Sequence, residues 1–179
     1  MKKRIVFDIC LIAVLIALGV VFSAFLQIPI YSDIRLDLSY IIIVYICYRF
    51  GALYGGFSAM SIAMLESTLF TAYGFSISWA TANFVLGAII GLSFQLTKGM
   101  KNKPLYYIIN VSSIVLAVAI GMLGIKTLIE CKLYEIPFNV KIVKNSVAFG
   151  LDLGVSLLGF LVLLPRMIIL DKKDEVKDE

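Results

Sequence analysis

The chain has no histidine among its 179 residues and only three cysteines. The lack of histidine excludes the imidazole ligands of most zinc sites, the base of a Ser-His triad and imidazole proton relays. Cys10, Cys47 and Cys131 form no CxxC pair and no metal-ligand spacing, and a cysteine in an apolar run packs as a small hydrophobic residue. We therefore expect no bound metal and no cofactor.

Charge is scarce as well. Charged residues make up 16% of the chain and hydrophobic residues 61%, whereas a soluble domain has about 25% and 45–50%. This composition excludes a soluble globular protein. About 20 apolar residues span a bilayer, so the length allows six spans with short connections and leaves no room for a soluble nucleotide-binding domain. Any work driven by ATP must come from a partner.

The apolar runs predict an all-α integral membrane protein, a single six-helix bundle over residues 1–170 with a charged, disordered cytoplasmic tail over 171–179. The predicted membrane segments are 5–25, 40–50, 52–70, 79–96, 105–125 and 147–169. Residues 38–70 are expected to form a helical hairpin that turns near Arg49–Gly51. The connections are expected to be polar loops at 27–39 and 71–78, a basic turn at 98–104 and a longer amphiphilic connection at 126–145.

The basic residues predict the orientation of this bundle. Six spans place both termini on one side. If that side is the cytoplasm, eleven basic residues lie inside: Lys2, Lys3, Arg4, Arg49, Lys98, Lys101, Lys103, Arg166, Lys172, Lys173 and Lys177. The outer loops then hold five: Arg35, Lys126, Lys132, Lys141 and Lys144. The excess of basic residues in cytoplasmic loops favours this orientation and a multi-pass protein of the cell membrane. The net charge of +4 is thereby explained without a nucleic-acid partner.

Small residues recur at i, i+4 along the predicted helices. Helices in lipid associate through close approach at such residues, so we expect four stripes to pack inside the bundle: Gly51, Gly55, Ala59 and Ala63; Gly87 and Gly91; Ser113, Ala117 and Gly121; Ser146, Gly150 and Gly154. A fifth pair, Ala13 and Ala17, lies on the first helix. From the residues alone, packing within the bundle and contact with another protein both remain open for this pair.

Polar and aromatic residues gather at the predicted outer ends of the helices. Ionisable groups within spans are costly and are functional candidates. We predict that a binding site for a small polar solute is lined by Gln27, Tyr31, Arg35, Asp37, Glu66, Tyr73, Trp79, Asn83, Lys141, Lys144, Asn145 and Asp152. Aromatic rings stack on planar heterocycles, amides and carboxylates read heterocycle edges, and Arg35 or the lysines can hold a carboxylate.

Plainer interpretations of these residues remain open. Asp33–Asp37 can be a solvated loop, Glu66 can pair with a lysine at the interface, and Trp79 can be an ordinary membrane-belt residue. A stand-alone small secondary transporter or channel is an alternative, although the inner half of the bundle looks apolar. An intramembrane enzyme would need Glu66 and Asp152 to converge, and the sequence shows no nucleophile motif.

Three stretches carry a resemblance to a known family. The pair Ala13 and Ala17 resembles its AxxxA motif on helix one, Ile34–Gly56 resembles its segment from loop one to helix three, and Trp79–Leu92 resembles its fourth helix. With about 180 residues and no ATPase domain, the chain resembles the substrate-binding S components of energy-coupling factor (ECF) transporters. The resemblance covers nearly the whole chain.

The resemblance implies a binding subunit rather than an enzyme. It implies capture of a vitamin-class micronutrient from outside and ATP-driven uptake with a membrane scaffold subunit and two cytosolic ATPases. Ala13 and Ala17 would then be the scaffold contacts.

The resemblance also bears on the substrate. Ile34–Ile41 and Val140–Asn145 are similar to segments of folate-specific members, although Ile42 stands in place of an expected proline and Lys141 in place of an expected arginine. This makes folate the first expectation, with riboflavin or a vitamin B6 compound next.

Overall fold

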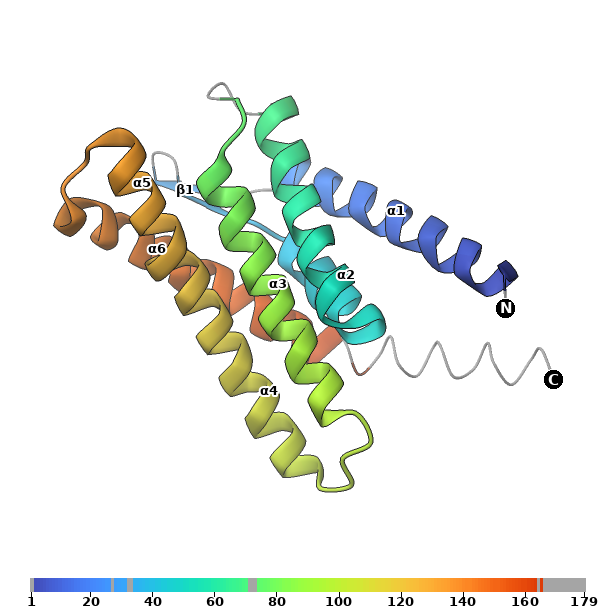
Figure 1. Cartoon of the computed structure of the whole chain (residues 1–179). Coiled ribbons are helices and arrows are strands. Elements are labelled where there is room, and N and C mark those ends of the chain that lie inside the picture. The colour runs from blue at the N-terminus through green and yellow to red at the C-terminus, as the bar shows by residue number, and fades with distance from the viewer. Residues whose placement is uncertain (1, 27, 32–33, 71–73, 164, 166–179) are drawn as a thin grey trace.

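A computed structural model describes residues 2–26, 28–31, 34–70, 74–163 and 165 of the chain. The fold is a bundle of helices with one short β-hairpin (Figure 1). In chain order the elements are α1 (Lys2–Phe25), β1 (Ile28–Tyr31), β2 (Ile34–Leu36), α2 (Ser39–Phe70), α3 (Ile77–Thr97), α4 (Lys103–Val118), the π-helix η1 (Ala119–Lys126), α5 (Thr127–Tyr134), α6 (Phe138–Leu158) and the π-helix η2 (Gly159–Leu163). The predicted tail at 171–179 lies outside the described residues.

Within the described part of the chain, five helices are long and apolar enough to cross a membrane, not the six predicted. The predicted segments 40–50 and 52–70 form one element, α2, which runs from Ser39 to Phe70. The non-helical backbone of Gly51 (φ 82°, ψ −164°) interrupts it where the turn of the helical hairpin was predicted. A β-carbon on Gly55 would lie 3.3 Å from the Cα of Cys47. Residues eight apart in a straight helix are about 12 Å apart along its axis, so the chain reverses at Gly51. The segment before the turn is too short to be a span of its own.

Glycines bring α2 and α3 together. A β-carbon on Gly87 would meet the carbonyl oxygen of Gly55 at 2.5 Å, and one on Gly91 would meet the backbone of Ala52 at 2.6 Å. The Sγ of Cys47 donates to the Gly87 carbonyl at 3.2 Å. Two of the predicted small-residue stripes therefore do pack inside the bundle, through backbone contact that only glycine allows.

The other stripes are divided. A β-carbon on Gly121 would lie 3.1 Å from the carbonyl oxygen of Ala82, so this glycine packs against α3. At Gly150 and Gly154, nothing lies within 4 Å of the position that a β-carbon would take. The prediction that the stripe on α6 packs inside the bundle is therefore wrong, because α6 turns its other face, with Asp152 and Ser156, inward.

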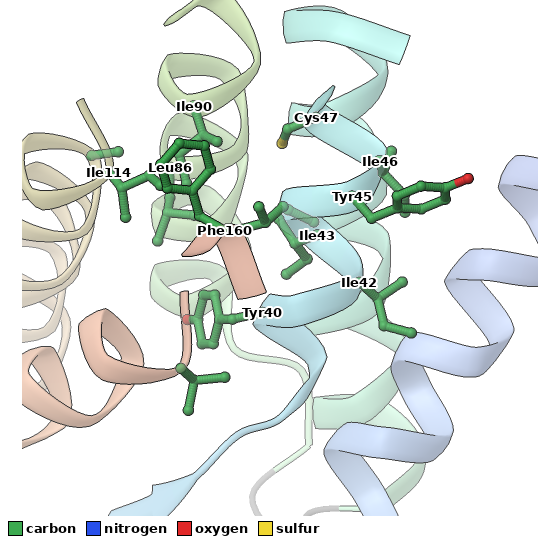
Figure 2. Close-up of a cluster of buried hydrophobic side chains, with 14 of the residues drawn as sticks. Tyr40, Ile42, Ile43, Tyr45, Ile46, Cys47, Leu86, Ile90, Ile114 and Phe160 are labelled. Carbon is green, nitrogen blue, oxygen red and sulfur yellow. The ribbon is translucent and has the colours of Figure 1, made fainter. Parts of the chain in front are cut away.

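The apolar core lies between α2, α3, α4 and η2, which continues α6. Figure 2 shows Ile43, Leu86, Ile114 and Phe160 converging from these four directions. α1 packs against α2, where Gly19 meets Ile62, and it lies at the edge of the bundle (Figure 1). Most of the rest of α1 is exposed, as expected for a helix that faces lipid or another protein.

Two connections differ from the sequence prediction. The stretch 27–39, expected to be a loop, contains the antiparallel strands β1 and β2, with Ile28 opposite Leu36 and Pro29 opposite Arg35. The stretch 126–145, expected to be an amphiphilic connection, is mostly helical, with α5 continuing from η1 and α6 beginning at Phe138. Asp152 therefore lies about four turns into its helix. Polar residues of 126–145 face a buried interface. Because these residues lower the hydropathy of the stretch, a prediction based on hydropathy does not recognise its helices.

Candidate functional site

Four of the predicted site residues gather around Tyr40, near the start of α2. Its hydroxyl interacts electrostatically with the carboxylates of Asp152, Asp37 and Glu66 and lies beside the side chain of Asn83. The reversal of α2 at Gly51 is what returns Glu66 to the level of Tyr40. Figure 2 shows the ring of Tyr40 directed from α2 toward the chain of α6. We call this end of the bundle, which also carries β1 and β2, the hairpin end.

The atoms of this group are buried. Tyr40 is 1% exposed and Asp152 and Asn83 are each 2% exposed. Asn83 donates its side-chain N–H to the carbonyl of Trp79 at 2.9 Å. The Tyr40 hydroxyl and the Oδ2 of Asp152, by contrast, have no hydrogen-bond partner within the described part of the chain. Buried polar groups in folded proteins nearly all have partners, so these two atoms mark a place where a polar ligand can bind.

Asp37 has a structural role in addition. One carboxylate oxygen accepts from the backbone N–H of Ser39 at 2.8 Å and the other accepts from the Ser23 hydroxyl at 3.0 Å. The first bond caps the start of α2, and the second ties the segment just before α2 to α1. Desolvation raises the pKa of the Asp37 carboxyl above its ordinary value, although these hydrogen bonds oppose the shift.

Trp79 lies in the first turn of α3, where Ser76 caps the helix by accepting from the Trp79 backbone N–H at 3.4 Å. The Nζ of Lys126, at the end of η1, lies 4.1 Å from the centroid of the Trp79 ring. Such a contact between an ammonium group and the face of an indole is attractive. Lys126 also interacts electrostatically with Glu130 and Asp152, so it connects the aromatic ring to the polar group around Tyr40.

A polar network around Glu130 joins α3, α5 and α6. The carboxylate of Glu130 forms an ion pair with Lys141 at 3.3 Å and accepts from the side chains of Asn145 at 3.3 Å and Ser78 at 3.5 Å. Asn145 also donates to the hydroxyl of Thr127 at 2.9 Å. Lys141 and Asn145 were predicted to line the site, and the network holds both at the hairpin end.

The remaining predicted residues are less well placed. Gln27 and Tyr73 lie outside the described residues. Tyr31 and Arg35 lie on β1 and β2, and the structure describes only their backbone. Lys144 lies on α6 and interacts electrostatically with Lys126. The structure thus brings together Asp37, Glu66, Asn83 and Asp152, and it brings Trp79 and Lys141 beside them through Lys126 and Glu130.

Three residues at this site were missed by sequence reasoning: Tyr40, Lys126 and Glu130. Tyr40 opens an apolar run, and Lys126 and Glu130 fall in the stretch interpreted as a connection. The spacing of Lys126 and Glu130 could have revealed them, since residues four apart share one helical face. Within the described part of the chain no group of three or more acidic residues or cysteines is placed to hold a metal ion.

The comparison with protein families decides what kind of protein carries this site. The family model for the ECF-type riboflavin transporter, S component, matches residues 4–167. The chain belongs to this family. S components are the substrate-binding subunits of ECF transporters, and this one is a multi-pass membrane protein. The resemblance seen in the sequence is thereby confirmed.

Two solved structures show the same fold as this S component. The S component for biotin from an ECF-type ABC transporter is similar with a TM-score of 0.64 and 16% identity, over 90% of this chain and 91% of that one. FolT bound with folic acid is similar with a TM-score of 0.60 and 20% identity, over 86% of this chain and 92% of that one. No curated protein sequence matches this chain significantly.

Proposed function

We propose that this S component captures a vitamin-class micronutrient with a planar heterocycle at its hairpin end, which faces the outside of the cell. The observation that carries the proposal is the buried group of Tyr40, Asn83 and Asp152, in which two polar atoms have no partner among the described residues. Sites for small molecules combine apolar surroundings with a few oriented polar groups, and these three residues supply such polar groups. Trp79 with Lys126 adds an aromatic face beside this group.

Folate is the first candidate ligand. The segments Ile34–Ile41 and Val140–Asn145 resemble those of folate-specific members, and one structural neighbour was solved with folic acid bound. The heterocycle of folate can form hydrogen bonds with the buried polar group. Its tail carries carboxylates, which the cations Lys126, Lys141 and Lys144 can bind. Riboflavin is the second candidate because the matching family model describes riboflavin transporters. A vitamin B6 compound is the third candidate.

Uptake requires partners in this proposal. The chain docks on a membrane scaffold subunit, and two cytosolic ATPases energise the complex. Ala13 and Ala17 are exposed on α1, while Leu15, Gly19 and Ser23 of the same helix are buried against the bundle. A small-residue face left open on a membrane helix supports close approach by another helix. A stand-alone transporter or channel would not need such a face.

The test is to identify what the protein holds. The full chain, purified gently in detergent, is analysed by mass spectrometry for retained small molecules and then titrated with folate, riboflavin and pyridoxine. A retained vitamin that rebinds, with weaker binding by Arg35→Ala and Asn83→Ala, supports the proposal. Retention of no vitamin, together with no binding of any of the three, would exclude it. Conduction by the chain alone in vesicles would favour the channel alternative.

A further inference from the structure

Two buried polar atoms at the hairpin end lack partners within the described part of the chain, and they come from different helices. They are the hydroxyl of Tyr40 on α2 and the Oδ2 of Asp152 on α6, and both residues are almost fully buried. A buried carboxylate or hydroxyl without a partner is destabilising. Each such group in a native structure calls for an explanation, such as a functional role or a bound partner. The pair is therefore a specific feature of the site and not a consequence of general polarity.

Two donors lie near Asp152, the hydroxyl of Tyr40 and the ammonium group of Lys126, but neither forms a hydrogen bond to its Oδ2 within the described part of the chain. Lys126 interacts with Asp152 electrostatically, but its ammonium group lies over the ring of Trp79 at 4.1 Å. Asp37 and Glu66 face Tyr40 and add further acceptors. Asn83 gives a side-chain N–H to the Trp79 carbonyl. The Oδ2 of Asp152 is a carboxylate oxygen and can only accept a hydrogen bond, so a ligand that completes it must carry a donor.

The shape of a carboxylate narrows the class of that ligand. A carboxylate only accepts hydrogen bonds, and it presents two oxygens side by side. An edge with two adjacent N–H groups, such as the N3–H and the 2-amino group of a 2-amino-4-oxopteridine, matches both oxygens. An imide edge, with one N–H between two carbonyls, would set a carbonyl oxygen against a carboxylate oxygen. Lumazine and the flavins carry such an imide edge.

We propose, on the basis of the function proposed above, that Asp152 and Tyr40 form the subsite that reads an amino-substituted edge of the ligand's heterocycle. Asp152 accepts from the paired N–H groups. Tyr40, which can both donate and accept, donates to a neighbouring ring nitrogen or carbonyl. The subsite therefore selects aminopteridines over their dioxo counterparts. Of the candidate vitamins, folate carries this edge and riboflavin does not.

The test uses two probes that differ at one position. Pterin carries an amino group at C2 and lumazine carries a carbonyl there. Calorimetric titration of the purified full chain should give at least about tenfold tighter binding of pterin, as expected for one charge-assisted hydrogen bond. This comparison needs no substitution, so it does not depend on the folding of a variant. Equal or tighter binding of lumazine would overturn the subsite.

Two substitutions sharpen the result. Asp152→Asn replaces one acceptor by a donor and should reduce the preference for pterin to less than about threefold. Tyr40→Phe should weaken pterin binding about three- to tenfold while the fold, followed by thermal unfolding, is kept. An Asp152→Asn variant that folds and retains the wild-type ratio would overturn the proposal.

The outcome also separates this inference from the function on which it rests. If riboflavin or lumazine binds as tightly as the aminopteridine, vitamin capture stands and the subsite assignment fails. If neither pteridine nor any of the three vitamins binds, the proposed function fails and the subsite fails with it.

Discussion

The Nζ of Lys126 lies 4.1 Å from the centre of the Trp79 ring, so the end of η1 is held against the first turn of α3. The two residues are 47 positions apart in sequence and belong to helices that meet at the hairpin end. This contact keeps a cation close to Asp152. A lysine in this position can donate a hydrogen bond to a ligand carboxylate or carbonyl, while the indole ring provides a flat apolar surface.

Replacing Lys126 should therefore impair binding. Lys126→Met removes the cation and keeps the length of the side chain, and we expect vitamin affinity to fall by roughly tenfold, the value of one charge-assisted hydrogen bond. Because Trp79 is the only tryptophan in the chain, quenching of its fluorescence follows the titration. Lys132→Met, at an exposed position on α5, is the matched control and should bind as the wild type does. Unchanged affinity in both variants would contradict this role.

The contact between α2 and α3 should tolerate no added methyl group. Gly91→Ala places a β-carbon 2.6 Å from the backbone of Ala52, and we expect a loss of about 1–3 kcal/mol of stability from overpacking. Gly150→Ala is the matched control, since nothing lies within 4 Å of its β-carbon position. That change should be neutral or stabilising by about 0.5–1 kcal/mol, because alanine is the better helix former. Thermal unfolding in detergent distinguishes the two, and equal effects would argue against the packing described.

Glu130 should matter for stability more than an exposed acidic residue does. Glu130→Ala leaves Lys141 and Asn145 without their shared acceptor, and a buried group left unsatisfied costs about 1–3 kcal/mol. Glu130→Gln keeps an acceptor and should cost less. Glu135→Ala, at an exposed position after α5, is the comparison. A denaturant or thermal series in detergent measures all three, and a cost at Glu130 no greater than at Glu135 would refute the network's contribution.

Asp37 should give stability a distinct pH dependence. Desolvation raises the pKa of its carboxyl in the folded chain, so the folded state holds this proton more tightly than the unfolded state. Its contribution is fully present below the unfolded value of 3.8 and is lost as pH rises through the raised folded value. Asp37→Asn keeps the cap on Ser39 and removes the titration. Its stability relative to the wild type should rise with pH across that window, whereas a constant difference would contradict the assignment.

The exposed alanines of α1 should separate binding from uptake. Ala13→Leu and Ala17→Leu add bulk on an open face, and we expect vitamin binding by the purified chain to be unchanged while cellular uptake with the scaffold and ATPases is lost. Val21→Leu, also exposed on α1, is the control and should transport normally. Uptake that survives both alanine substitutions would remove the docking assignment.

The sequence was sufficient to predict the class of protein, but not the contacts between its helices. Scarce charge and long apolar runs were enough for a helical membrane protein, because burial in lipid imposes a composition on every span. The residues Asp37, Glu66, Asn83 and Asp152 were chosen as candidates for the same reason, since ionisable and amide groups stand out in apolar surroundings.

What the sequence did not reveal depends on contacts between distant segments. Tyr40 looks like any aromatic residue of an apolar run until α6 brings Asp152 to it. Lys126 and Glu130 resemble loop residues because hydropathy cannot tell a solvated charge from one that is buried with partners. The prediction that Gly150 and Gly154 pack inside the bundle was wrong. Which face of a helix turns inward depends on the helices packed against it, and a stripe of small residues does not specify them.

The reversal at Gly51 limits where α2 can gain or lose residues. Tyr40 and Glu66 reach the same site from two arms that share one turn, and that turn has no space for a side chain beside Gln95. Inserting or deleting one residue in either arm would rotate its polar residue by about 100° and shift it by about 1.5 Å. We therefore expect the number of residues between Gly51 and each site residue to be as constrained as the residues themselves.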